Sequence, residues 1–348
     1  MNKLRVGIIG LGIGRSHIRG FQSHLGAEVV AITDLDETRL KVSGDEFKIP
    51  GRYRDAQEML AKEKLDIVSV CTPNKFHKPL TLAALQADCH VLCEKPMAMN
   101  TAEAREMLAA AKSANKRLMI NFSYRFHLQS WAIKAQVDAG ALGDIYFART
   151  MWLRRRFIPG FGGWFGQKEL SGGGPIIDLG VHRLDLALWF MGYPKPAWVL
   201  ASTYNAIGSR VAKEKGAKFD VEDFGVALIK FHNGATLELE ASWTSYIAEQ
   251  ELMETRLFGT LGGAVQRNVG ETYKFEAELF VERNGAQYDM KLHYPPGPEV
   301  PNQFHHFVES IVHDKPHIAT GEEGLIVMEL LDAIYESAAT GRPVEIKQ

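Results

Sequence analysis

The amino-acid sequence predicts an α/β protein with two domains: a doubly wound parallel sheet, then a mostly antiparallel sheet. The chain has 348 residues, which exceeds the size at which one hydrophobic core keeps growing, so about two domains are expected. In the first third, short apolar segments alternate with helical patterns, as in parallel sheets that are covered on both faces. After residue 123, segments of alternating polarity follow one another, which favours antiparallel pairing.

The first domain is expected to span residues 1–122. Its short apolar segments predict strands at 4–9, 28–33, 66–71, 89–93 and 117–121. The intervening segments carry helical patterns, at 16–25, 36–46, 55–62, 75–87 and 101–114. Because strands and helices alternate so regularly, we expect helices on both faces of a doubly wound sheet.

The second domain is expected to span residues 123–348. Two alternating segments flank Asn233-Gly234 within 224–243, which is the strongest short signal for a β-hairpin. Further strands are predicted at 144–153, 197–205, 251–258, 272–281 and 286–293, interrupted by one helix near 175–190. Helices at 302–313 and 321–339 finish the chain, and we expect the second of them to pack back on the first domain. A sheet of this size needs its other face covered, so we expect a homodimer or homotetramer that forms through it.

The composition excludes several classes of function. Lys and Arg total 40, Asp and Glu total 42, and the net charge is −2, so no charge pattern favours nucleic acid or membrane, and small neutral partners are expected. Cys71, Cys89 and Cys93 are an odd set that we place in strands, as buried thiols rather than disulfides or a metal site. No signal peptide or membrane span is apparent at the N-terminus. We therefore expect a cytoplasmic protein that binds no metal.

The turn GLGIG follows the first predicted strand and opens a helix, which is the context of a dinucleotide-binding fingerprint. Gly10 and Gly12 would let the backbone approach a pyrophosphate, and the helix N-terminus would supply free N–H groups. Gly14 comes one residue earlier than in GxGxxG, and Arg15 holds the usual place. Such a turn alone is weak evidence, but with Ile13 these glycines are the expected pyrophosphate-binding residues.

Asp34 strengthens the prediction of a dinucleotide site. It ends the second predicted strand, 22 residues after Gly12, where a carboxylate can accept hydrogen bonds from both ribose hydroxyls of adenosine. Its charge would repel a 2′-phosphate, so NAD is expected rather than NADP, although Arg39 lies nearby. The alternative is that Asp34 only caps the next helix.

Residues that follow strands are further candidates, because ligands in such sheets lie beyond the carboxyl ends of the strands. Lys95 would project from a strand end into the cleft for the nicotinamide, and Pro96 would fix the turn that aims it. The alternative for Glu94 and Lys95 is a solvated surface position. The cofactor-binding residues expected at strand ends are Thr72, Asn74, His77, Glu94, Lys95 and Asn121.

A predicted buried helix within 172–190 carries three polar residues on one face. Asp178, His182 and Asp185 are spaced by four and three residues, so they should share a face. They could form a satisfied structural network. Because the stripe starts beside three glycines that permit close approach of a ligand, we favour a substrate site.

Arg154-Arg155-Arg156 and the glycine- and aromatic-rich segment 159–165 predict a loop, either a lid or a solvated turn. We expect Arg154 to bind substrate and Trp164 to contact the cofactor. Tyr294 and His305 are further conceivable contributors to specificity.

These motifs together resemble the glucose–fructose oxidoreductase, inositol dehydrogenase and rhizopine-catabolism (Gfo/Idh/MocA) family over essentially the whole chain. The matching segments are GLGIGRSH, CTPNKFH, EKP, GGGPIIDLGVHRLD and YESAATGRPV. The resemblance implies an N-terminal Rossmann domain, a C-terminal α/β domain with an open-faced sheet, bound NAD or NADP, and oxidation or reduction of a sugar or cyclitol hydroxyl. It also makes Lys95, Asp178 and His182 the catalytic and substrate-binding residues.

In this interpretation His182 is the base for the hydroxyl proton. Lys95 stabilises the developing alkoxide, and Asp178 orients the sugar. Two alternatives stay open: redox-assisted glycoside cleavage with tightly bound NAD, and a noncatalytic NAD sensor, which would need no base.

Overall fold

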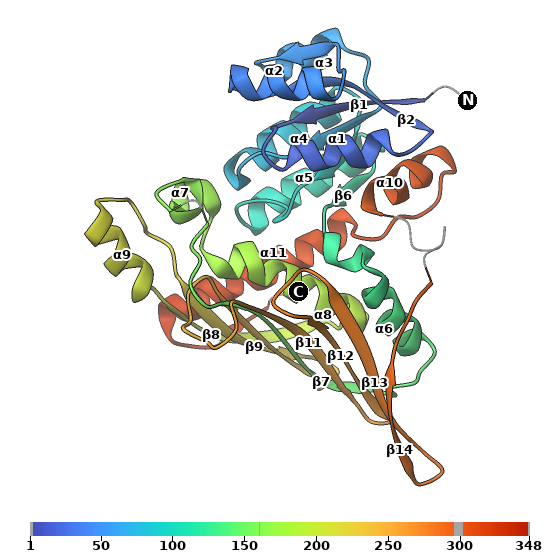
Figure 1. Cartoon of the computed structure of the whole chain (residues 1–348), viewed down its shortest axis with the longest axis vertical. Helices are drawn as coiled ribbons and strands as arrows, with labels where there is room; N and C mark the ends of the chain where they lie inside the picture. The colour runs from blue at the N-terminus through green and yellow to red at the C-terminus, as the bar shows by residue number, and fades with distance from the viewer. Residues whose placement is uncertain (1–2, 160, 296–301, 347–348) are drawn as a thin grey trace. The chain divides into compact units, whose positions relative to one another are not determined.

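The computed structural model describes residues 3–159, 161–295 and 302–346 (Figure 1). These residues form two compact units. Unit 1 takes in the described residues of Met1–Asn121 and Pro301–Met328, and unit 2 those of Phe122–Val300 and Glu329–Gln348.

Unit 1 is built on a parallel sheet with six strands in the part of the chain that the structure describes, in the order β3-β2-β1-β4-β5-β6. The strands are β1 (Leu4–Ile9), β2 (Ala27–Thr33), β3 (Gly51–Tyr53), β4 (Ile67–Val70), β5 (His90–Cys93) and β6 (Leu118–Ile120). The helices between them are α1 (Gly14–Gln22), α2 (Glu37–Glu46), α3 (Ala56–Lys62), α4 (His77–Gln86) and α5 (Thr101–Ser113), with a 3-10 turn, η1 (Asn74–Phe76), before α4. The predicted doubly wound sheet is confirmed. Its strand order reverses between β1 and β4, which makes their carboxyl ends the usual position for a ligand.

Two later helices contribute to unit 1. The first, α10 (Gln303–Val312), packs on α1, and the ring of Phe304 lies 5.2 Å from that of Phe21. A Cβ atom on Gly20 would lie 2.0 Å from the Phe304 ring, so only glycine leaves room for this contact. The first part of α11 (Gly321–Thr340) also belongs to unit 1, and the rest of that helix belongs to unit 2.

Unit 2 is built on a mostly antiparallel sheet, which has nine strands within the described ranges, in the order β14-β13-β12-β11-β7-β10-β9-β8-β15. The predicted antiparallel sheet is confirmed, and β7 with β10 is its parallel pair. Gly234, at φ +90°, turns the predicted hairpin. The strands are β7 (Ile145–Arg154), β8 (Pro196–Tyr204), β9 (Phe224–Phe231), β10 (Thr236–Ser242), β11 (Glu251–Gly259), β12 (Gly262–Asn268), β13 (Phe275–Arg283), β14 (Ala286–Lys291) and β15 (Val344–Glu345).

The helices of unit 2 correct the prediction of one helix between residues 123 and 300. Besides α8 (Val181–Met191), the structure contains α6 (Leu128–Asp138), α7 (Lys168–Ser171) and α9 (Ile207–Lys215), with 3-10 turns η2 (Ser123–Phe126) and η3 (Trp164–Gly166). The buried side of α9 is formed by small residues, Gly208 and Ala212, so this helix has no wide apolar stripe to reveal it. The strand β12 was also missed, because it begins with two glycines and carries polar residues.

The helices α6 and α8 lie on one face of this sheet. Gln266 of β12 donates to Ser130 of α6 at 2.6 Å, and Thr150 of β7 donates to the carbonyl of Arg183 in α8 at 3.4 Å. Alternation along β9 buries Ile229 while Leu228 points away. As far as the structure describes unit 2, the sheet therefore has one face covered by its helices and one face without them.

The composition led to predictions about the cysteines, membrane spans and metal sites. All three cysteines are buried free thiols, but only Cys93 lies inside a strand, because β4 ends before Cys71 and β5 begins after Cys89. Among the described residues, no helix has the length and apolarity needed to cross a membrane. In the same residues, no three His, Cys, Asp or Glu side chains are gathered closely enough to hold a metal ion.

Candidate active site

The glycine turn after β1 is shaped to receive a ligand. Gly10 has φ +91°, and a Cβ atom there would lie 2.6 Å from the carbonyl oxygen of Cys71, so the fold itself requires this glycine. At Gly12 a Cβ atom would meet no protein atom within 4 Å. Exposed Ile13 precedes α1, which has no side-chain cap and no acidic residue in its first turn. The N–H groups of this turn therefore remain suited to the negative charge of a pyrophosphate.

Gly14 has a different role. It is buried, and a Cβ atom there would lie 3.1 Å from Ile8 of β1. This glycine allows close packing of helix on strand although its spacing departs from the usual fingerprint.

Asp34 follows β2 and fixes the glycine turn. Its Oδ2 accepts from the N–H of Leu11 at 2.7 Å, and its Oδ1 accepts from the N–H of Asp36 at 2.9 Å. The cap of α2 is Asp36, which accepts from the N–H groups of Thr38 and Arg39. The alternative that Asp34 caps this helix is therefore wrong. Each oxygen of Asp34 keeps acceptor capacity for a ribose hydroxyl.

The strand ends after β4 and β5 are tied together by His77. This side chain is fully buried, and its ring nitrogens lie 2.7 Å from the carbonyl oxygen of Pro96 and 2.9 Å from that of Thr72. A neutral imidazole donates to one of them only, and burial lowers the pKa of His77. In the described chain, the buried hydroxyl of Thr72 has no hydrogen-bond partner. Asn74 is buried and starts η1.

Glu94, before Lys95, is the centre of a buried network. Its Oε1 accepts from His17 Nε2 at 2.8 Å and from Asn121 Nδ2 at 2.5 Å, and its Oε2 accepts from the N–H of Lys95 at 3.2 Å. His17 in turn lies 2.7 Å from the hydroxyl of Ser69. The solvated position considered for Glu94 is therefore wrong, since only 8% of this residue is exposed. Lys95 itself is half-buried.

His17 was not predicted as a site residue, although it ends the motif GLGIGRSH. It is fully buried. Burial alone would lower the pKa of His17, but interactions with Cys71 and Glu94 outweigh it and raise this pKa to about 10. Burial would likewise raise the pKa of Glu94, but the hydrogen bond from His17 lowers it. The two side chains therefore form a buried ion pair that links α1 to the segment carrying Lys95.

In unit 2, Asp178 and His182 lie at the start of the predicted buried helix. This start is a π-helical turn, η4 (Ile176–Gly180), which continues as α8. Such turns are frequent at functional sites. Asp178 Oδ2 accepts from Trp243 Nε1 at 3.0 Å. The ring of His182 lies 4.9 Å from that of Tyr124 and 5.8 Å from that of Trp152.

Asp185, the third member of the predicted stripe, belongs to a structural network. It is 1% exposed, and its carboxylate accepts from Arg125 Nε at 2.8 Å and from the hydroxyl of Tyr193 at 2.7 Å. Arg125 is fully buried. For this residue the network interpretation is therefore correct and the substrate-site interpretation is wrong.

Arg154 lies in the same part of unit 2 as His182. Its Nε donates to Glu251 Oε1 at 2.8 Å, and Trp152 Nε1 donates to the same oxygen at 2.6 Å. Burial would lower the pKa of Arg154, but Glu251 and, more weakly, Tyr273 and Asp178 raise it. The Trp152 ring thus lies beside both Arg154 and His182.

The remaining candidates have contacts of their own, and Phe165, the neighbour of Trp164, lies 6.4 Å from the ring of Trp243. Trp164 is stacked on Phe165, with ring centroids 3.9 Å apart. Arg155 donates to the carbonyl of Ala248. His305 lies in unit 1, 2.8 Å from the hydroxyl of Ser23, and Tyr294 is half-buried after β14.

Arg183 is a second buried arginine that sequence patterns did not reveal. Its guanidinium lies over the rings of Tyr124, Phe275 and Trp152, at 4.6, 5.2 and 5.6 Å from their centroids. Burial lowers the pKa of Arg183 to about 10. The aromatic residues around it come from distant segments, so no local motif could have identified this arrangement.

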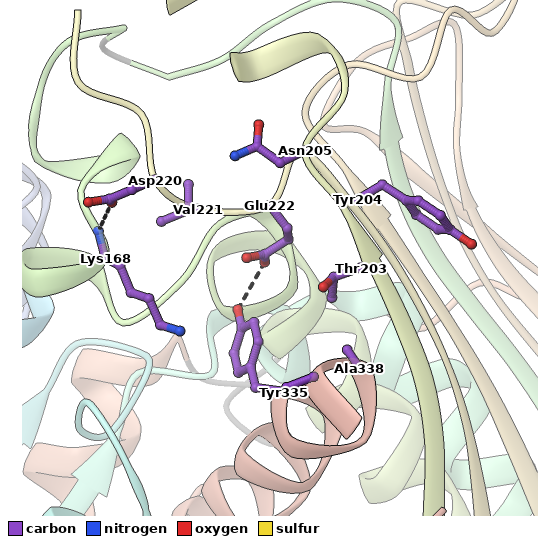
Figure 2. Close-up of a pocket in the computed structure, with 10 residues that line it drawn as sticks. Lys168, Thr203, Tyr204, Asn205, Asp220, Val221, Glu222, Tyr335 and Ala338 are labelled. Atoms are coloured by element: carbon purple, nitrogen blue, oxygen red, sulfur yellow. Dashed lines mark hydrogen bonds between the residues drawn. The ribbon is translucent and has the colours of Figure 1, made fainter. Parts of the chain in front are cut away.

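A pocket of about 270 Å³ opens in unit 2, and the described residues that line it include none of the predicted site residues (Figure 2). Residues from the end of β8, from the segment before β9 and from α11 line it. Glu222 and Tyr335 face it and are hydrogen-bonded to each other at 2.9 Å.

Comparison with known proteins finds two family domains in the chain. The model described as "Oxidoreductase family, NAD-binding Rossmann fold" matches residues 4–122. The model described as "Oxidoreductase family, C-terminal alpha/beta domain" matches residues 134–346. Both are models of the Gfo/Idh/MocA family.

Several known proteins resemble the whole chain. D-glucoside 3-dehydrogenase of Escherichia coli (strain K12) is 35% identical, over 99% of this chain and 97% of that protein. Myo-inositol 2-dehydrogenase of Thermotoga maritima is 26% identical, over 99% of both. The crystal structure of an aldose-aldose oxidoreductase from Caulobacter crescentus, complexed with glycerol, is 27% identical, with a TM-score of 0.83 over 99% of this chain and 100% of that one.

The raised pKa of His17 predicts a pH-dependent contribution to stability. We expect His17→Leu to lower the free energy of unfolding by about 3–5 kcal/mol near pH 6, because it leaves the Glu94 carboxylate buried without its cation. Stabilisation from a raised pKa is complete below the unfolded value of 6.5 and is lost as pH rises through about 10. The difference between variant and wild type should therefore shrink between pH 6.5 and 10.

Thermal and urea unfolding at several pH values measure this difference. His313→Leu, which alters a half-exposed histidine beside Glu309, is the matched control and should have little effect. A destabilisation by His17→Leu that is equal at pH 6 and pH 10 would contradict the ion pair.

Proposed function

The chain belongs to the Gfo/Idh/MocA oxidoreductase family, a family of sugar and cyclitol dehydrogenases, and on this premise we propose a specific activity for it. The protein transfers a hydride between NAD and a secondary hydroxyl or keto group of a sugar, sugar derivative or cyclitol. The observation that supports this most is the exposed turn at Gly12, which leads into an uncapped helix beside the carboxylate of Asp34.

The surroundings of Asp34 support NAD rather than NADP. A 2′-phosphate placed beside this carboxylate would be repelled, whereas ribose hydroxyls can donate to it. Arg39, the nearby cation that could offset a phosphate, pairs with Asp36, with 3.4 Å between Nε and Oδ2.

We assign the chemical roles to Lys95, Asp178 and His182. The nicotinamide, when bound, supplies the acceptor or donor of the hydride. His182 takes the hydroxyl proton during oxidation, since histidine most readily accepts a proton near neutral pH. Lys95 donates a hydrogen bond to the reacting oxygen and stabilises its negative charge. Asp178, whose Oδ2 is held by Trp243, accepts from a neighbouring hydroxyl and orients the ring.

Arg154 and Trp164 are proposed to complete the site. Arg154 is held by Glu251 and presents a cation beside Trp152, where it could donate to a substrate hydroxyl. Trp164, stacked on Phe165, offers an apolar face to the cofactor. Thr72, Asn74 and Asn121 would contact the cofactor at the strand ends. There His77 bonds to the carbonyl of Thr72, and Glu94 accepts from the side chain of Asn121.

The names of relatives suggest which substrates to test first. The relative at 35% identity is a D-glucoside 3-dehydrogenase, so D-glucosides are the leading candidates, and myo-inositol and free aldoses follow. Incubation with NAD and each polyol, followed by NADH absorbance, tests the proposal. Glycoside cleavage without NADH would favour the redox-assisted reaction instead, and NAD binding without turnover of any polyol would favour a sensor.

For His182→Ala we expect kcat to fall by roughly 10²–10⁴-fold, because general acid–base catalysis is typically worth that much. NAD affinity should stay near the wild-type value. Steady-state kinetics with the best polyol measures the change, and His232→Ala, at an exposed histidine, is the control. A loss below about threefold would refute the role of His182 as the base.

Lys95→Met should abolish turnover while NAD still binds, because it removes the positive charge at the reacting oxygen and leaves the glycine turn untouched. Calorimetric titration with NAD, set beside turnover, separates the two effects. Lys78→Met alters a lysine that pairs with Glu106 on the surface of unit 1 and should change neither. Full activity in Lys95→Met would mean that the lysine plays no part in the chemistry.

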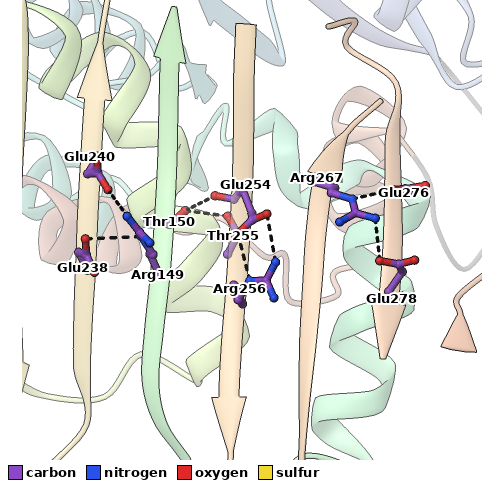
Figure 3. Close-up of polar contacts among 10 residues, drawn as sticks. All are labelled: Arg149, Thr150, Glu238, Glu240, Glu254, Thr255, Arg256, Arg267, Glu276 and Glu278. Atoms are coloured by element: carbon purple, nitrogen blue, oxygen red, sulfur yellow. Dashed lines mark hydrogen bonds and ion pairs between the residues drawn. The ribbon is translucent and has the colours of Figure 1, made fainter. Parts of the chain in front are cut away.

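We also propose that two copies associate through the uncovered face of the unit 2 sheet. This face carries alternating charges on neighbouring strands (Figure 3). Arg149 pairs with Glu240 at 2.8 Å, and Arg267 pairs with Glu276 at 2.7 Å and with Glu278 at 3.0 Å. A face with both signs can complement a second copy about a twofold axis. Exposed Leu200 and Leu228 on adjacent strands add apolar area.

Arg149→Glu should shift this association toward monomer. Arg149 now pairs with both Glu238 and Glu240, and the substitution would place three carboxylates together on the proposed interface. Sedimentation velocity measures the mass, and circular dichroism checks the fold. The control is Arg54→Glu, a surface charge in unit 1. A monomeric wild type, or an unchanged mass for Arg149→Glu, would rule this interface out.

A further inference from the structure

Glu222 lies two residues before β9 and holds the start of the helix that carries Asp178 and His182. Only 8% of it is exposed. Its Oε2 accepts from the N–H of Gly174 at 2.9 Å, and its Oε1 accepts from the N–H of Ile176 at 3.1 Å and from the hydroxyl of Tyr335 at 2.9 Å. One carboxylate thus binds two backbone groups at the helix start and a side chain of α11.

The glycines before this helix are explained by the same contacts. A Cβ atom on Gly173 would lie 2.0 Å from the Tyr335 hydroxyl, and one on Gly174 would lie 2.0 Å from the carbonyl oxygen of Glu222. The sequence suggested that these glycines admit a ligand. For Gly173 and Gly174, the atoms that approach the backbone closely are the protein's own, from Tyr335 and Glu222, and not those of a ligand.

Glu222 takes the place of a side-chain cap at this end of the helix. Pro175, which precedes η4, makes no capping hydrogen bond. A carboxylate at a helix N-terminus satisfies free N–H groups and complements the helix dipole. The neighbouring Asp223 does the same for α9, accepting from the N–H groups of Ile207 and Gly208 at 2.7 and 2.6 Å. These adjacent acids therefore hold two different helices.

The contacts of Glu222 reach the proposed site through few bonds. Asp178 is two residues beyond Ile176, and its own N–H donates to the carbonyl of Gly174 at 3.0 Å. Trp243 holds the Asp178 carboxylate from the side of β10. A shift of the helix start would therefore move Asp178 directly and His182 one turn later.

We infer that Glu222 is a positioning residue for the proposed reaction: its carboxylate, oriented by Tyr335, sets where the helix carrying Asp178 and His182 begins. This inference rests on the proposed function. Burial raises the pKa of Glu222, and the N–H donors oppose that rise.

The pocket beside Glu222 provides a direct test. Its volume of about 270 Å³ exceeds that of a small carboxylate, and it opens onto both Glu222 and Tyr335 (Figure 2). In Glu222→Ala, acetate from solution can occupy the missing position and accept the same hydrogen bonds.

In Glu222→Ala we expect kcat to fall by about 100-fold, as for a displacement of roughly 1 Å at the reacting groups, with NAD affinity unchanged. Adding acetate should raise the kcat of the variant at least tenfold, and chloride at the same concentration should not raise it. Asp220→Ala, in the same pocket, should keep its activity and not respond to acetate. A kcat within twofold of wild type, or a folded variant that acetate does not rescue, would overturn the inference.

Two further measurements distinguish a failure of this inference from a variant that does not fold and from a failure of the proposed function. If Glu222→Ala does not fold, Tyr335→Phe decides: a kcat about tenfold lower supports the inference, and a wild-type kcat overturns it. If the wild type oxidises no polyol, the proposed function fails instead. Hydrogen exchange of the amides at 174–182 still tests the positioning in that case. Exchange should be faster in Glu222→Ala than in the wild type and slower again when acetate is added. Exchange that Glu222→Ala leaves unchanged would overturn the inference.

Discussion

Buried carboxylates that receive several hydrogen bonds are the interactions on which the proposed chemistry depends. Glu94 holds the segment of Lys95, and Glu222 holds the helix of Asp178 and His182. A carboxylate taken out of water is costly unless donors surround it, and each of these has three donors. Such a group tolerates little displacement, because any shift leaves an acceptor unsatisfied. The residues proposed to react are therefore held by groups that the substrate need never touch.

The same residue types play two different parts within one helix. Asp178 is half-buried and held through one oxygen by Trp243, whereas Asp185 is buried in an ion pair with Arg125. Arg154 at the end of β7 and Arg183 in α8 also differ. Arg154 is half-buried and pairs with Glu251, whereas Arg183 is fully buried among aromatic rings. A polar residue on a buried helix is thus not by itself evidence of chemistry. Its exposure and the donors around it distinguish an orienting group from a structural one.

Much of the fold could be predicted because its signals are local. The strands of unit 1 are buried runs with few polar residues, and the predicted ranges agree with β1, β2, β4, β5 and β6 to within two residues at each end. The three-residue β3 and the helix α9, whose buried residues are small, carry no such signal. The same limit applies to the site. Lys95, Asp178 and His182 stand in motifs, but the partners of Glu94 and Glu222 lie up to 77 and 113 residues away in the sequence. Only the folded chain brings His17 and Tyr335 to them.

We propose that Lys95 and His182 act on a single hydroxyl of a sugar or cyclitol. A crystal structure of the protein with NADH and a bound polyol tests it most directly. We expect the Lys95 ammonium and one ring nitrogen of His182 both to lie within about 3.2 Å of the same hydroxyl oxygen. A structure in which these side chains contact different molecules, or in which the polyol lies against neither of them, would contradict it.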